Sequence, residues 1–163
     1  MAASKDTRYH EAGHAVAAHM LGIGLKEEGM ILYSDSNAEV MVADRPNGAS
    51  EDWIIRRVAA KLAGPVAMCL KRREKLEWES LKCSKEYYTD IQYSERILCE
   101  YYLELAVGPN RTLIDERMNR SFCLAMDCVQ KNQALIDAVA DAAEGRDQLS
   151  RSEIIACIQA CQQ

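Results

Sequence analysis

The chain has 163 residues, of which 48% are hydrophobic, and its formal net charge is −5. This composition is typical of a globular domain with a real core and excludes a disordered chain. The negative charge argues against sequence-independent nucleic-acid binding, which needs clustered Lys and Arg side chains against phosphates. No apolar run reaches the roughly 20 residues that cross a bilayer, and no secretory signal precedes the seven cysteines. We therefore expect a cytoplasmic protein without a membrane segment, whose thiols are reduced and mostly buried.

The hydrophobic pattern predicts an α+β fold that is mostly helical, with a small sheet in the first third of the chain. A first helix begins at Ser4 or Asp6 and ends near Leu21. Two short β-type stretches follow, residues 30–33 and 39–43, and turn-forming residues separate them. These two stretches predict a hairpin or two neighbouring strands.

The rest of the chain reads as helical. Apolar residues at helical spacing predict helices over residues 51–70, 89–106, 113–130 and 133–144, and a last one that opens at Ser150 with a capping box. Gly64 and Pro65 should kink or interrupt the helix that contains them. Residues 71–88 are charged and show no clear pattern. Gly108-Pro109-Asn110 should end the helix before it.

Residues 10–14 read His-Glu-Ala-Gly-His. Residues four apart on a helix lie on the same face, so His10 and His14 point the same way and can bind one Zn²⁺. Glu11 lies near that face and can take a proton from a zinc-bound water without ligating the metal. An HExxH match arises by chance in about half a percent of chains of this composition. The motif therefore predicts a zinc site with Glu11 as the general base.

A catalytic zinc needs a third protein ligand and one open position. Spacing alone leaves several carboxylates open, namely Glu27, Glu28, Glu39, Asp90 and Asp115. Asp90 falls in the first turn of a predicted helix, where the helix dipole favours a carboxylate. That preference alone would explain the presence of Asp90 at this position equally well, without a role in metal binding. His19 lies five residues after His14, off the metal face, and is interpreted as a surface or packing residue.

The segment from Tyr9 to Val16 resembles the zinc motif of the FtsH family, the membrane-bound ATP-dependent zinc proteases. In that family the third ligand is an aspartate far downstream, at the start of a later helix. Thr89-Asp90-Ile91 resembles that segment, and Asp90 lies 80 residues after His10. The resemblance implies that His10, His14 and Asp90 bind zinc and that Glu11 is the base.

The chain differs from the family pattern at several positions, and these differences limit which family properties the resemblance implies. The chain has no GxxxxGK[ST] sequence, so the resemblance covers the peptidase part only, without the AAA ATPase module and membrane anchor. The Gly-Ala pair that usually precedes the aspartate is replaced by residues 86–88, and the Arg of the family's middle Gly-Arg-Ala-Ala is Pro65 here. We expect residues 1–163 to form one peptidase-like domain, with a zinc-site half (1–108) and a helical C-terminal segment (109–163).

The first functional hypothesis is a zinc metallopeptidase that hydrolyses unfolded proteins or peptides, alone or with a separate ATPase partner or as a homo-oligomer. The strand near residues 39–43 would pair with an extended substrate by β-addition, or it is a core strand. The second is a catalytically retired peptidase fold that serves as a binding or adaptor module. The third is a metal-free helical interaction protein in which the motif is accidental.

Overall fold

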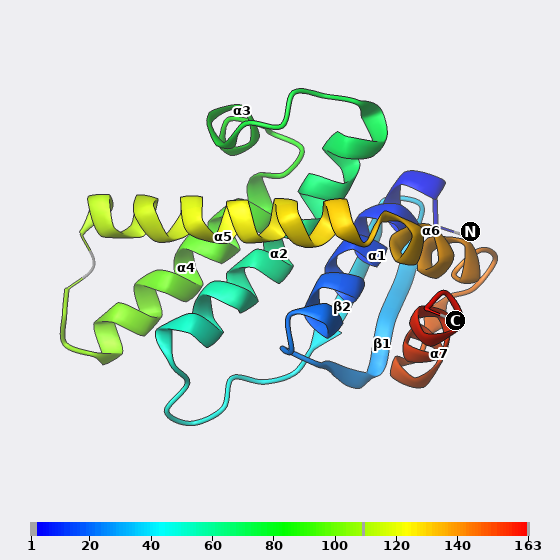
Figure 1. Ribbon diagram of the computed structural model, residues 1–163, viewed down its shortest axis with the longest axis horizontal. Helices are drawn as coiled ribbons and strands as arrows, with labels where there is room; N and C mark the ends of the chain where they lie inside the picture. Colours follow the sequence, from blue (N-terminus) through cyan, green and yellow to red (C-terminus); the bar gives the residue numbers. More distant parts are fainter. Residues whose placement is uncertain (1–2, 109, 163) are drawn as a thin grey trace.

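The computed structural model describes residues 3–108 and 110–162. Pro109, which was expected to help end a helix, lies outside the described residues. In chain order the elements are α1 (Lys5–Met20), β1 (Leu25–Ser34), β2 (Asn37–Val42), α2 (Glu51–Arg72), α3 (Trp78–Lys82), α4 (Tyr88–Glu104), α5 (Arg111–Lys131), α6 (Gln133–Ala142), β3 (Gln148–Leu149) and α7 (Arg151–Ala160). The predicted α+β, mostly helical fold is confirmed (Figure 1). Within the described ranges, no helix combines the length and the apolarity that a membrane crossing requires.

Serine side chains cap the starts of α1, α2 and α7. The Ser4 hydroxyl accepts a hydrogen bond from the Thr7 N–H at 3.1 Å, which fixes the first turn of α1. Ser50 caps α2 in the same way. The capping box predicted at Ser150 is present, because its hydroxyl and the Glu153 carboxylate each accept from the other residue's backbone N–H. These bonds satisfy backbone donors that have no partner within the helix.

The structure corrects two local predictions and assigns one segment that had no prediction. The first strand begins at Leu25 and not at residue 30, because Gly29 adopts a left-handed backbone (φ 67°) that carries the strand through an irregularity. The charged segment 71–88 contains a short helix, α3. The helix α2 is not interrupted at Pro65 and continues to Arg72, since a proline removes one backbone hydrogen bond and the buried face of the helix holds the remainder.

The sheet has the strand order β2-β1-β3 and is antiparallel throughout. Met30 in β1 pairs with Val40 in β2 on one side and with Leu149 in β3 on the other. The third strand comes from the far end of the chain and was not predicted. One consequence is that β2 is an edge strand, with β1 along only one of its sides.

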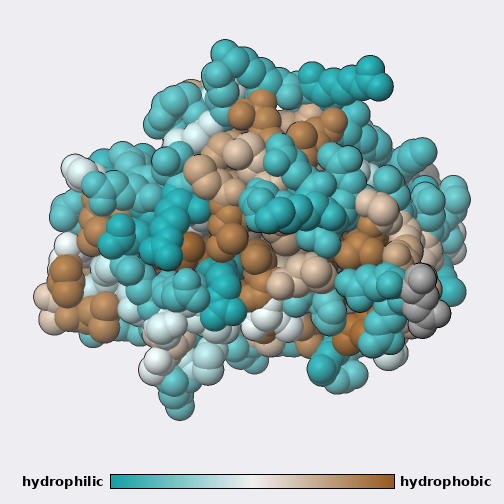
Figure 2. Space-filling model, viewed as in Figure 1, coloured by the Kyte–Doolittle hydropathy of each residue, from teal (hydrophilic) through white to brown (hydrophobic). Residues whose placement is uncertain are grey.

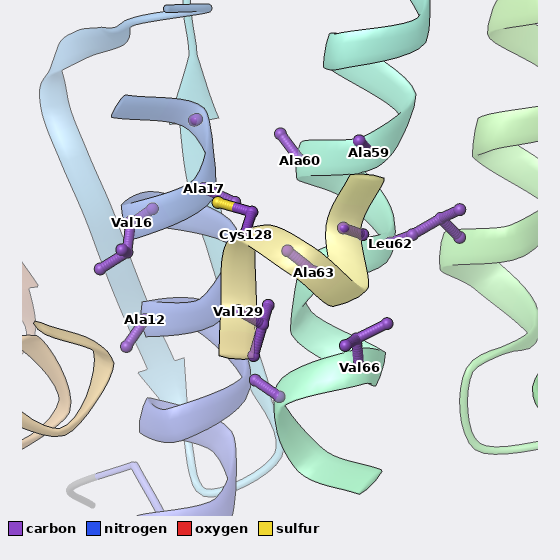
Figure 3. Close-up of a cluster of buried hydrophobic side chains, with 14 of the residues drawn as sticks. Ala12, Val16, Ala17, Ala59, Ala60, Leu62, Ala63, Val66, Cys128 and Val129 are labelled. Atoms are coloured by element: carbon purple, nitrogen blue, oxygen red, sulfur yellow. The ribbon is translucent and has the colours of Figure 1, made fainter. Parts of the chain in front are cut away.

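The core lies where α1, α2 and α5 meet (Figure 3). Its side chains are mostly small, and the three helices contribute Ala12, Val16, Ala17, Ala59, Ala60, Leu62, Ala63, Val66, Cys128 and Val129. Small side chains let helix axes approach closely, because no bulky group separates the backbones. On the outside, polar residues cover most of the face in view, and hydrophobic residues form smaller patches between them (Figure 2).

The helices α1 and α2 lie in close contact at Gly13. A Cβ atom at this position would lie 2.8 Å from the Ala63 carbonyl oxygen and 2.9 Å from the Ala67 Cβ. The first of these neighbours is backbone and cannot move without moving α2. Gly13 therefore has a packing role inside the motif: it lets the helix that carries His10 and His14 lie against α2.

We predict that Gly13→Ala destabilises the fold. The added methyl group gains about 1 kcal/mol of helix propensity, but overpacking against the α2 backbone costs more, so the free energy of unfolding should fall by about 1–3 kcal/mol. Chemical denaturation followed by circular dichroism measures this difference. Gly108→Ala is the matched control, because a Cβ there meets nothing within 4 Å. Equal stability of the two variants would contradict the packing role.

Candidate metal centre

The structure brings together the two predicted histidines and one of the five candidate carboxylates. His10 and His14 lie on α1, and Asp90 lies in the first turn of α4. The two Nε2 atoms are 3.0 Å apart. An Asp90 oxygen lies 3.0 Å from the His10 Nε2, and the other lies 3.7 Å from the His14 Nε2. This His10-His14-Asp90 cluster could hold a metal ion.

The spacing of these atoms fits a small cation. Zinc binds nitrogen and oxygen ligands at about 2.0–2.1 Å in a tetrahedron, which places neighbouring ligand atoms about 3.3 Å apart. The separation between the two Nε2 atoms and that between the His10 Nε2 and the Asp90 Oδ2 are both 3.0 Å, slightly below that value. Three side-chain ligands leave a fourth position free. The donor set and its geometry therefore fit a tetrahedral ion with one open position.

The ring of His14 contacts the α2 backbone through its Nδ1. This atom lies 2.9 Å from the Ala60 carbonyl oxygen. A carbonyl oxygen only accepts hydrogen bonds, so this hydrogen bond forms in the tautomer with the proton on Nδ1, in which Nε2 can offer its lone pair to a metal ion. In the other tautomer the Gly64 N–H, 3.3 Å away, donates to the same Nδ1. A backbone carbonyl that orients a histidine in this way is a common outer partner of metal-ligating imidazoles.

Gly64 keeps the space between the two imidazoles free. A Cβ at this position would lie 2.4 Å from the His14 Nε2 and 2.9 Å from the His10 Nε2. Both distances are shorter than real Cβ contacts, so a side chain at this position would displace the imidazoles. The α2 backbone can approach the cluster only because residue 64 has no side chain.

Asp90 is an ionised carboxylate in a mostly buried position. Burial by itself would raise the pKa of this carboxyl, but the two imidazoles and the Lys61 ammonium outweigh burial and hold the pKa well below its usual range. Lys61 lies on α2, and its Nζ is 2.8 Å from the Asp90 Oδ1. At neutral pH the carboxylate is therefore charged and faces the imidazoles, as a metal ligand must be.

Glu11 opens onto a cavity of about 450 Å³ beside the cluster. The walls come from α1, β2, α2 and α4, and they include Glu39, Val40, Val42, Arg57, Ala60, Lys61, Tyr93 and Ile97. Glu11 is 8% exposed, and within residues 3–108 and 110–162 no hydrogen bond or ion pair engages its carboxylate. It is not one of the cluster ligands. This carboxylate is thus available to a molecule in the cavity.

The other candidate ligands lie elsewhere or have other partners. Glu27 pairs with Arg151 at 2.9 Å, and Asp115 pairs with Arg111 at 3.1 Å. Glu28 is exposed on β1. Glu39 lines the cavity, but its carboxylate accepts a hydrogen bond from the Tyr33 hydroxyl. His19 is half-buried in the last turn of α1 and does not line the cavity.

Several residues that shape the site were not singled out from the sequence. Gly64 was interpreted only as a helix breaker, and Lys61 was not considered. The ring of Tyr87, which is buried, stacks on the His10 ring at 6.1 Å between centroids. The one sequence signal that pointed to Lys61 was its position inside the otherwise apolar run from Val58 to Val66. An unpaired charge on a buried helix face is costly, so a lysine there needs a partner.

No model of a known protein family matches the chain, and no curated protein matches it. The properties of the site therefore rest on its residues and their geometry.

We predict that Gly64→Ala abolishes metal binding. The added methyl group would occupy the space between the two Nε2 atoms and push the imidazoles apart. Isothermal titration with Zn²⁺ or Co²⁺ measures the loss, and circular dichroism shows whether the variant is folded. Gly108→Ala should bind metal as the wild type does. A folded Gly64→Ala protein that binds metal with unchanged affinity would show that the ion does not bind at this cluster.

Proposed function

We propose that this protein is a zinc-dependent peptidase that hydrolyses peptide bonds in unfolded proteins or peptides. The observation that carries the proposal is the convergence of two imidazoles and a carboxylate beside a cavity into which a fourth group, Glu11, opens. A purely structural zinc site is closed by four protein ligands and has no use for a free carboxylate next to it. The resemblance of residues 9–16 and 89–91 to FtsH proteases supports the same function.

His10, His14 and Asp90 would hold the ion. Two neutral nitrogens and one carboxylate suit zinc better than Mg²⁺ or Ca²⁺, which prefer oxygen ligands throughout. When bound, zinc acts as a Lewis acid that polarises a carbonyl oxygen and lowers the pKa of a water molecule to about 7. The alignment of the histidines depends on the chain itself, through the Ala60 carbonyl and the absence of a side chain at Gly64.

Glu11 would act as the proton carrier of the reaction. Its carboxylate accepts the proton of the water that attacks the scissile carbonyl, and it then donates this proton to the leaving amine. No other side chain in the described part of the chain ties up this carboxylate, so it is free to make both transfers. Its low exposure limits competition from bulk water and strengthens its electrostatic interactions.

The substrate class follows from the wall that β2 forms. Residues 37–40 and Val42 line the cavity, and β2 is an edge strand of the sheet. An extended peptide can pair with a free strand edge through main-chain hydrogen bonds, largely independently of its sequence. Most extended segments of a folded protein are already paired or buried, so we propose unfolded segments as substrates. A separate ATPase partner or a homo-oligomer would supply unfolding where it is needed.

The second candidate function is a catalytically retired peptidase fold that serves as a binding or adaptor module. The Lys61 ammonium favours it, because it neutralises Asp90 at 2.8 Å as a metal ion would. Such a module would hold peptides along β2 without cleaving them. Peptide binding without turnover of any substrate, in the presence of zinc, would support this second function.

We predict that Glu11→Gln retains zinc and lowers kcat by about 10²–10⁴-fold, the usual contribution of a general base. Cleavage of casein and of a fluorogenic peptide library, with and without a chelator, measures activity, and elemental analysis measures zinc. Glu28→Gln is the matched control, since Glu28 is exposed on β1 and does not line the cavity. Full activity of Glu11→Gln, or cleavage that a chelator does not inhibit, would contradict the proposed mechanism.

A further inference from the structure

Lys61 contacts the candidate metal centre from outside the ligand set. Its Nζ lies 2.8 Å from the Asp90 Oδ1, and the same ammonium lies over the Tyr93 ring at 5.5 Å from the centroid. The lysine side chain is 32% exposed. It follows Ala60, whose carbonyl oxygen orients His14. Two consecutive residues of α2 thus hold two different members of the cluster.

The two oxygens of Asp90 have different partners. Oδ1 is bound by Lys61, whereas Oδ2 lies 3.0 Å from the His10 Nε2. A carboxylate can ligate a metal ion through one oxygen or through both, and the second mode uses a coordination position that a reacting water would need. An ammonium on one oxygen favours the first mode, because that oxygen's lone pair is directed at the hydrogen-bond donor.

We propose that Lys61 is a positioning residue that holds the Asp90 Oδ1 and leaves only Oδ2 for the metal ion. The inference rests on the proposed zinc site. Lys61 preserves the open position of the site by limiting Asp90 to one ligand atom, and it orders the carboxylate before metal arrives. The contact with Tyr93 holds the ammonium in place, since a cation over an aromatic face is attracted to it.

The positive charge of Lys61 has the opposite effect on metal affinity from its positioning role. This difference makes the proposal testable. A positive charge beside a cation site repels the incoming ion, so a lysine without a positioning role would weaken metal binding. Removal of the lysine would then strengthen binding. If the hydrogen bond to Oδ1 dominates, removal weakens binding, as the loss of an outer hydrogen-bond partner of a ligand does by about 10–100-fold.

The experiment compares Lys61→Met and Lys61→Arg with the wild type. Zinc affinity is measured by competition with a chromophoric chelator, and the number of ligands is read from the visible spectrum of the Co²⁺-loaded proteins. We expect Lys61→Met to bind zinc about 10-fold more weakly and to give a weaker Co²⁺ absorption, as the second carboxylate oxygen joins the ion. Lys61→Arg, which keeps a charged donor, should restore both properties.

Lys75→Met is the control for the loss of one positive charge, because Lys75 is 73% exposed and pairs with Glu77. Circular dichroism checks the fold, and Lys61→Ala carries the same expectation if Lys61→Met does not fold. Zinc binding by Lys61→Met that is unchanged or tighter, or an unaltered Co²⁺ spectrum, overturns the inference while the proposed function stands. A wild-type protein that binds no metal overturns both.

Discussion

The site depends on the close contact between α1 and α2. At Gly13 the two backbones come so near that a methyl group would collide with the Ala63 carbonyl. This contact places the α2 backbone directly under the imidazoles, where the Ala60 carbonyl can accept from His14. A larger separation between the helices would leave the imidazole free to rotate. The alanine-rich core between α1, α2 and α5 maintains the contact along the rest of its length.

Charge balance at the cluster is the second constraint. Asp90 lies at the start of α4, where the helix dipole favours a carboxylate, and it is surrounded by two imidazoles and an ammonium. A buried carboxylate with no such partners would be strongly destabilising. The contacts that keep Asp90 ionised also direct it toward the histidines. Stability of the fold and readiness for a cation are therefore properties of the same group of contacts.

The sequence predicted the features that depend on local spacing. The helical period placed His10 and His14 on one face, and serine caps marked the starts of α1 and α7. The pairing of β1 with a strand from the far end of the chain was not predicted, because a two-residue strand has no periodicity to detect. The contributions of Lys61 and Gly64 were also missed, since they depend on how two helices cross and not on any local pattern.

The third ligand shows what residue spacing predicts and what only tertiary packing decides. Residue spacing left five carboxylates open, and the FtsH resemblance singled out Asp90. The structure brings Asp90 to the histidines through the packing of α4 against α2, whereas Glu27 and Asp115 form ion pairs elsewhere. A local sequence pattern specifies which side chains share a face, but tertiary packing decides which distant side chain reaches that face.

The strand order places β3, which lies near the C-terminus, beside β1 in the first third of the chain. One side of β1 pairs with β3, and the other side pairs with β2, which forms a wall of the cavity. Gln148 and Leu149 therefore support the cavity wall through β1, although neither of them lines the cavity. Removal of this segment would leave main-chain groups of β1 without partners on the side of the sheet opposite to β2. A truncated chain would then present a longer unpaired strand edge and would tend to self-associate.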